Sequence, residues 1–107
     1  MGSVSDRQIS ALIEQATVDC DNESEQVTGF FTMIADNLGV PFATQVLGVE
    51  VTVEAVDLTE DEQIVAVCSR GRFRQRLPIL DLPVPDPAPD GAEWIEAYRA
   101  WSKGSWS

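Results

Sequence analysis

The sequence predicts one α+β domain with two N-terminal helices, a small antiparallel sheet and a C-terminal helix. Apolar residues recur every three or four positions near both ends of the chain, and they alternate with polar residues in the middle. The length of 107 residues is also typical of one compact domain. We therefore expect residues 1–107 to share one core. The alternative is a helical N-terminal hairpin loosely tethered to a separate small barrel.

The N-terminal part of the chain carries the signals of two helices. Ser5 and Gln8 have the spacing of a capping box, which predicts a helix running to about Val18. A polar stretch, residues 19–25, is expected to form a loop that leads into a second helix. The apolar stripe of that helix comprises Val27, Phe30, Phe31, Ile34 and Leu38, and Pro41 follows its end.

The middle of the chain changes to a period of two residues, which is typical of strands. Alternation over residues 49–54, an apolar run over residues 64–68 and alternation over residues 73–77 predict three strands, with a further strand at residues 42–46. The short turns between them indicate an antiparallel meander, either a sheet or a small SH3-like barrel.

The C-terminal part combines a Pro-rich segment with a last helix. Proline recurs at every second position over residues 83–89, which predicts an extended surface segment. A helix is expected after Asp90, with its apolar stripe docked on the core. The residues predicted to share that core are Val27, Phe30, Phe31, Ile34, Val51, Val53, Val65, Val67, Trp94 and Trp101.

Composition excludes several classes of function. Eighteen acidic residues face seven basic ones, and the formal charge of −11 disfavours binding to nucleic acid or to an anionic membrane. The chain has no His and only two cysteines, Cys20 and Cys68, which removes the usual general base and leaves too few ligands for a structural zinc site. We expect a soluble, cytoplasmic monomer with reduced thiols that is not an enzyme.

Carboxylate oxygen is the ligand that remains in quantity, and it suits calcium and magnesium. Acids stand at every second position in Asp19, Asp21, Glu23 and Glu25. If this stretch is a loop, several of these side chains can point at one centre. The EF-hand pattern is absent, because Ser24 stands where its Gly is required and Phe30 where its Glu is required. The alternative is a helix N-terminus favoured by negative charge.

Further acids lie elsewhere in the chain. Asp36 would lie about 16 Å from Glu25 if both were helical, so it needs other partners to bind an ion. Asp57, Glu60 and Asp61 belong to a predicted acidic turn over residues 57–62, whose like charges would be relieved by a cation. The alternative for this second cluster is an ordinary exposed turn.

Four of the seven basic residues are concentrated in and around the last predicted strand. These are Arg70, Arg72, Arg74 and Arg76. Because the net charge opposes nucleic-acid binding, we expect the arginines to pair with acids on neighbouring strands or to protect a sheet edge.

Several segments resemble the cyanobacterial calcium-binding protein family called CcbP. The similar segments are residues 30–38 with Pro41 and Phe42, residues 46–49, residues 64–68 with Arg70 and Gly71, and residues 80–83 and 91–99 with Trp101. Together they span roughly residues 16 to 101. The most specific part is the tail, with Trp94, Tyr98 and Trp101.

The resemblance implies a small cytoplasmic protein that binds calcium through acidic surface patches without an EF-hand, as a buffer or in signalling. The family has an acidic stretch before its second helix, which corresponds here to residues 19–25. Its Asp-Asn-Leu motif corresponds to residues 36–38. Where the family is expected to have Tyr-Gly between the first acids, this chain has Asp21-Asn22. The rival function is an SH3-like interaction module whose acidic face meets a basic protein.

Overall fold

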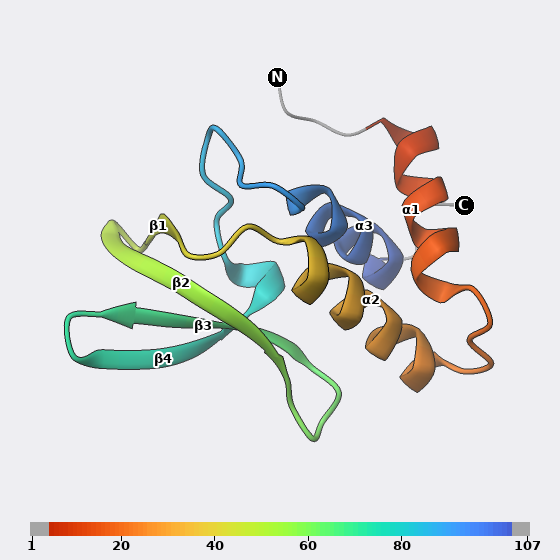
Figure 1. The fold of residues 1–107 in the computed structure, drawn as a ribbon, viewed down its shortest axis with the longest axis horizontal. Helices are drawn as coiled ribbons and strands as arrows, with labels where there is room; N and C mark the ends of the chain where they lie inside the picture. Colours follow the sequence, from red (N-terminus) through yellow and green to blue (C-terminus); the bar gives the residue numbers. More distant parts are fainter. Residues whose placement is uncertain (1–4, 104–107) are drawn as a thin grey trace.

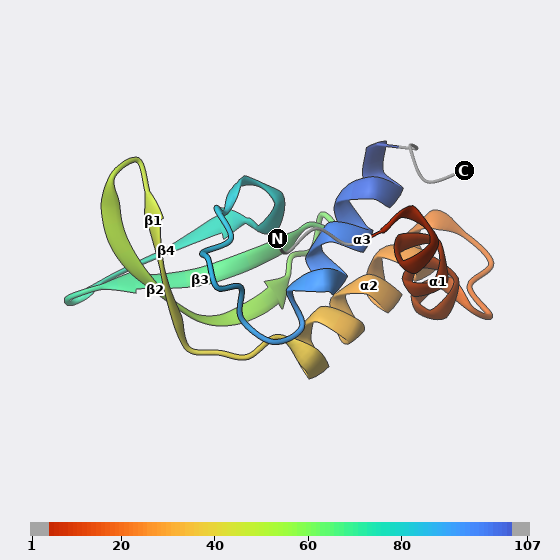
Figure 2. The same cartoon turned by 90° about the horizontal axis from the view of Figure 1, so that it is seen from above.

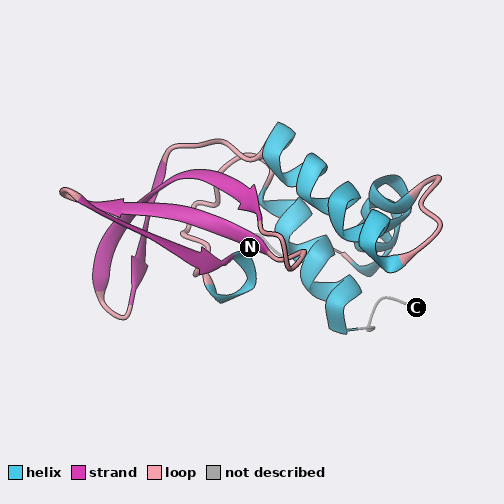
Figure 3. Ribbon diagram, turned by 90° about the horizontal axis from the view of Figure 1, so that it is seen from below, coloured by secondary structure: helices cyan, strands magenta, loops and turns pink. Residues whose placement is uncertain are grey.

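The computed structural model describes residues 5–103, and it confirms the predicted α+β class. Three helices gather on one side of the molecule and a four-stranded sheet lies on the other (Figure 1). The helices are α1 (Asp6–Thr17), α2 (Glu23–Asn37) and α3 (Ala92–Lys103), as the residue patterns predict. Figure 3 shows the same separation of helices and strands from another side. Within the described residues, no helix has the length and apolarity required to cross a membrane.

Side-chain caps determine where the first two helices begin. The Ser5 Oγ accepts a hydrogen bond from the Gln8 backbone N–H at 3.2 Å, which confirms the predicted start of α1. Asn22 caps α2 in the same way, since its Oδ1 accepts from the Glu25 N–H at 2.9 Å. The two helices approach closely at Gly29, where an added Cβ would lie 2.1 Å from the Ala16 carbonyl oxygen.

The sheet is an open antiparallel meander. Its strands are β1 (Phe42–Val46), β2 (Val49–Leu58), β3 (Ile64–Arg70) and β4 (Phe73–Pro78). They pair in the order β1-β2-β3-β4, so that β1 and β4 form the two edges, and the alternative of a closed SH3-like barrel is wrong. The β1–β2 and β3–β4 turns point away from the helices, whereas the β2–β3 turn lies on the helical side (Figures 1 and 2).

The core contains residues from the helices and from one face of the sheet. Val27, Phe30, Ile34, Val51, Val53 and Trp94 belong to the buried cluster, and Phe31 and Trp101 pack against it, as predicted. In β3, Ile64, Ala66 and Cys68 join the cluster. Val65 is buried, as predicted, but lies outside the cluster, and Val67 is only half-buried. An all-apolar strand carries no alternation, so its sequence does not specify which side faces the core.

Helix α3 docks on α2 through aromatic rings. The ring centroid of Phe30 lies 5.4 Å from that of Tyr98 and 5.3 Å from that of Trp101. The Trp101 indole Nε1–H also donates to the Gln26 Oε1 at 3.0 Å. This contact supplies the polar partner that a half-buried indole requires.

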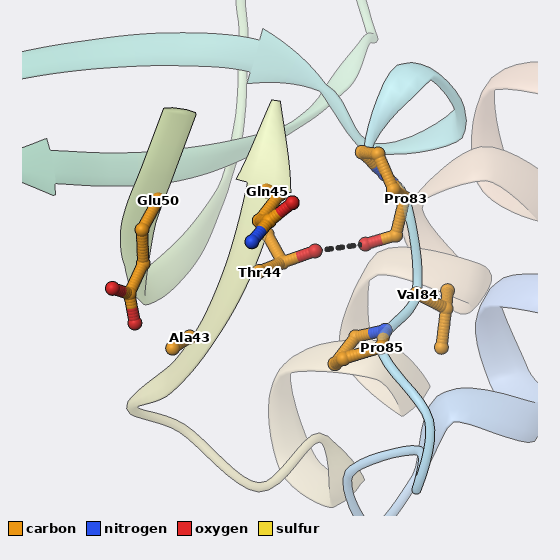
Figure 4. Close-up of a pocket in the computed structure, with 7 residues that line it drawn as sticks. All are labelled: Ala43, Thr44, Gln45, Glu50, Pro83, Val84 and Pro85. Atoms are coloured by element: carbon orange, nitrogen blue, oxygen red, sulfur yellow. Dashed lines mark hydrogen bonds between the residues drawn. The ribbon is translucent and has the colours of Figure 1, made fainter. Parts of the chain in front are cut away.

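A short 3₁₀ helix, Ile79–Asp81, precedes the Pro-rich segment and was not expected from the residue pattern. The Pro-rich segment then runs alongside β1, where the Thr44 hydroxyl donates to the Pro83 carbonyl oxygen at 2.6 Å (Figure 4). A groove of about 460 Å³ lies between the two, lined by residues including Gln45, Glu50 and Pro85. The Pro-rich segment is therefore held to the edge of the sheet before it reaches α3.

Candidate functional site

The four acids of residues 19–25 do not share one loop. Asp19 and Asp21 lie in the loop after α1, but Glu23 and Glu25 lie in the first turn of α2. The expectation of a single loop is wrong, because the Asn22 cap starts the helix at Glu23. Asp19 has a φ of 62°, a left-handed conformation that Asp tolerates better than most side chains.

The Glu25 carboxylate helps to cap the N-terminus of α2. Its Oε1 accepts from the Asp21 backbone N–H at 3.0 Å, and its Oε2 accepts from the Asn22 Nδ2 at 3.4 Å. Together with the Asn22 cap, these bonds form an arrangement close to a capping box. Glu25 thus has a structural role that competes with binding an ion.

Asp57 lies in β2 and not in the predicted turn, because β2 continues to Leu58. Its Oδ1 accepts from the Leu58 N–H at 2.8 Å, and its Oδ2 lies 3.3 Å from the Arg76 Nη2. A second pair joins Glu54 to Arg74 at 3.4 Å. These two ion pairs confirm that β4 arginines pair with acids across the sheet, and the pair with Arg76 occupies the Asp57 carboxylate.

The β2–β3 turn contains Glu60, Asp61 and Glu62, all exposed. Glu62 has a φ of 65°, and its carboxylate accepts a hydrogen bond from the Ser24 hydroxyl of α2. This contact spans 38 residues and brings the turn against the N-terminus of α2. The acidic turn therefore touches the first turn of α2, where Glu23 and Glu25 lie.

The sequence does not predict this contact. Glu62 belongs to the predicted acidic turn but not to the candidate ligands, and Ser24 has no predicted role beyond its failure to match the EF-hand pattern. Nothing in the local pattern links a serine in a helix to a turn 38 residues later. A long-range contact of this kind leaves no periodic signal in a single sequence.

Asp36 lies apart from the other acids. It is exposed on α2 near Asn37, the last helical residue, while Glu23 and Glu25 lie in the first turn. Both Glu25 and Asp36 are helical, so the predicted separation of about 16 Å holds. One ion cannot be shared between these two ends.

The donor chemistry of the acidic end fits a hard cation, because it consists of carboxylate, hydroxyl and backbone oxygens. Over residues 5–103, however, no three carboxylate or thiol groups are already arranged as a metal site. The acids are exposed and their side chains can rotate on the nanosecond scale. The backbone brings the oxygen-bearing segments together, and an ion would have to draw the side chains inward.

Comparison with known proteins supports the fold. No protein-family model matches the sequence, and no curated protein sequence matches it significantly. Among solved structures, the crystal structure of Anabaena CcbP superposes with a TM-score of 0.75 at 17% identity, covering 94% of each chain. A calcium-binding protein in its calcium-binding form superposes with a TM-score of 0.72 at 15% identity, covering 98% of this chain and 99% of that one. The chain thus has the CcbP fold, as the sequence resemblance implied.

Proposed function

We propose that this protein binds calcium ions at the acidic end formed by the N-terminus of α2 and the β2–β3 turn. The observation that carries the proposal is the contact between Ser24 and Glu62, which brings two acidic segments together on a fold shared with a calcium-binding protein. Neither segment has the EF-hand pattern. The proposed role is that of a cytoplasmic calcium buffer or sensor, and not that of an enzyme.

The candidate ligands differ in how free they are to bind an ion. Glu23 in α2 and Glu60 and Asp61 in the turn are exposed carboxylates, with Asp19 and Asp21 in the adjoining loop. Glu25 and Asp57 are weaker candidates, because each already accepts hydrogen bonds from backbone N–H groups. Asp36 would serve a separate ion at the other end of α2.

Calcium should stabilise the folded protein more than magnesium does. An ion that binds only the folded state at 100 times its dissociation constant adds about 2.7 kcal/mol, which raises the melting temperature of a domain of this size by roughly 10 °C. Magnesium holds its water and demands stricter geometry, so its effect should be smaller. Calorimetric titration and thermal unfolding in chelator-treated buffer measure both effects.

Matched substitutions distinguish a site from general screening of a negative surface. Glu23→Gln and Asp61→Asn should each remove most of the calcium-induced shift. Glu50→Gln is the control, because Glu50 is equally exposed but lies on the β1–β2 hairpin. Equal small losses in all three variants would show that calcium only condenses on the surface, and the absence of heat with calcium would exclude the proposed function.

The rival function, an SH3-like module with an acidic face for a basic partner, has less support. The sheet is open, and on its outer face Glu54 and Asp57 are paired with Arg74 and Arg76. That face is therefore partly neutralised within the molecule. Binding of a basic protein in calcium-free buffer, without any response to calcium, would favour this rival.

A further inference from the structure

The charge of this protein is unevenly distributed, and four of its basic residues gather on the β3–β4 hairpin. Arg70 ends β3, Arg72 lies in the β3–β4 turn, and Arg74 and Arg76 lie on β4. The β3–β4 hairpin points away from the helices (Figure 1). A protein with a net charge of −11 thus presents four of its seven basic residues on one hairpin.

Two of these arginines have no acidic partner among the described residues. Arg74 and Arg76 form ion pairs with Glu54 and Asp57, whereas neither Arg70 nor Arg72 forms an ion pair within residues 5–103. At physiological ionic strength, charges more than about 8 Å away are largely screened. A ligand at the hairpin would therefore respond mainly to the local positive charge.

Phe73 adds an apolar contact surface to the same hairpin. It pairs with Arg70 across the strands, and 75% of its surface is exposed because the helices do not reach this part of the sheet. A hollow of about 340 Å³ is lined by Phe73, Ser69, Arg70, Arg74 and Gln75. An exposed aromatic ring beside unpaired arginines is typical of a surface that binds a partner.

The backbone of β4 is also available for pairing. Since β4 is an edge strand of the described sheet, alternate N–H and C=O groups along it point away from β3. Residues 73–77 provide these groups before Pro78, which has no N–H. An extended peptide can add to such an edge as a further strand.

We propose that the β4 edge binds an acidic peptide in an extended conformation, with its carboxylates on Arg70 and Arg72 and its apolar side chains on Phe73. The charge on the hairpin selects this occupant. If two copies of β4 paired with each other, their arginines would lie close together, and the repulsion between like charges would destabilise the pairing. Arg70 and Phe73 are cross-strand partners and therefore share one face of the sheet. A peptide that repeats Glu-Glu-Val-Val presents both Glu and Val on each of its faces, so it can satisfy the arginines and the aromatic ring.

The test uses the full chain in calcium-free, chelator-containing buffer, so that the acidic peptide cannot act by removing calcium. A labelled nine-residue peptide of repeated Glu-Glu-Val-Val is titrated by fluorescence anisotropy, beside the same peptide with Lys in place of Glu. We expect binding of the Glu peptide alone. Backbone amide shifts in the NMR spectrum should be largest over residues 70–77.

Variants then examine the contribution of each group. Arg70→Gln combined with Arg72→Gln should weaken binding about tenfold, and Phe73→Ala about fivefold, without a change in thermal stability. Arg7→Gln on α1 is the control and should leave the affinity unchanged. Equal binding of the Lys peptide, amide shifts elsewhere, or tighter binding of a single-stranded oligonucleotide than of the Glu peptide would overturn the proposal. The NMR result does not depend on any variant folding correctly.

Discussion

At the junction between the Pro-rich segment and α3, Gly91 adopts a φ of 83° and lies against the end of α2. An added Cβ there would lie 2.2 Å from the Asn37 carbonyl oxygen and 2.7 Å from the Leu38 backbone nitrogen. The neighbouring Gly39 N–H donates to the Asp90 carbonyl oxygen at 2.7 Å. Backbone meets backbone at this point, so no side-chain rotation can make room.

Gly91→Ala should therefore destabilise the protein by roughly 2–4 kcal/mol, because it adds a steric clash to the cost of a left-handed alanine. The matched control is Gly48→Ala, which has a φ of 79° but no atom within 4 Å of the added Cβ. The control should lose only about 1 kcal/mol. Urea unfolding measures both, and equal losses would contradict a steric role for Gly91.

The buried Cys68 thiol and the half-buried Tyr98 phenol should make the stability fall at alkaline pH. Burial raises the pKa of the Cys68 thiol above its ordinary value of 9.0 and that of the Tyr98 phenol above 10.0. In each case the folded state holds its proton more tightly than the unfolded state does. The stabilisation is complete below the unfolded pKa and is lost as pH rises through the folded pKa.

The free energy of unfolding should consequently fall above about pH 9, and more steeply above about pH 10. Tyr98→Phe should remove the steeper part, because Tyr98 is the single tyrosine of the chain. Urea titrations from pH 7 to pH 11 provide the measurement. An unchanged slope in the Phe variant would show that burial of Tyr98 is not the cause.

At the scale of single elements, the sequence predicts best where polar and apolar residues alternate. Val51 and Val53 in β2 are placed correctly in the core, because their neighbours Glu50 and Thr52 are polar. In β3 every residue from 64 to 68 is apolar, so the side that faces the helices is decided by the pairing with β2. A register set by a neighbouring strand is not visible in the strand itself.

The acidic segments show the same limit of prediction from the sequence alone. Asp57 looks like a turn residue beside Glu60 and Asp61, but it pairs with Val65 and extends β2. Its ion pair with Arg76 depends on β4 lying beside β3. Local composition identifies acidic residues, but only the sheet shows which of them are already paired.

At the scale of the whole molecule, one core joins the helices to the sheet. Ile34 of α2, Val53 of β2 and Trp94 of α3 belong to the same buried cluster. We therefore predict that residues 1–107 unfold in a single transition, with the calorimetric enthalpy equal to the van't Hoff enthalpy. Two separate transitions would instead favour a helical hairpin tethered to an independent sheet.

The contact between Trp101 and Gln26 gives the molecule an internal optical reporter. The Trp101 indole is half-buried, is stacked on Tyr98 and donates its N–H to α2, the helix whose first turn carries Glu23 and Glu25. Indole emission depends strongly on the polarity around the ring and on the hydrogen bond of its nitrogen. A displacement of α2 on ion binding would therefore shift the wavelength of the protein's own fluorescence, without any attached dye.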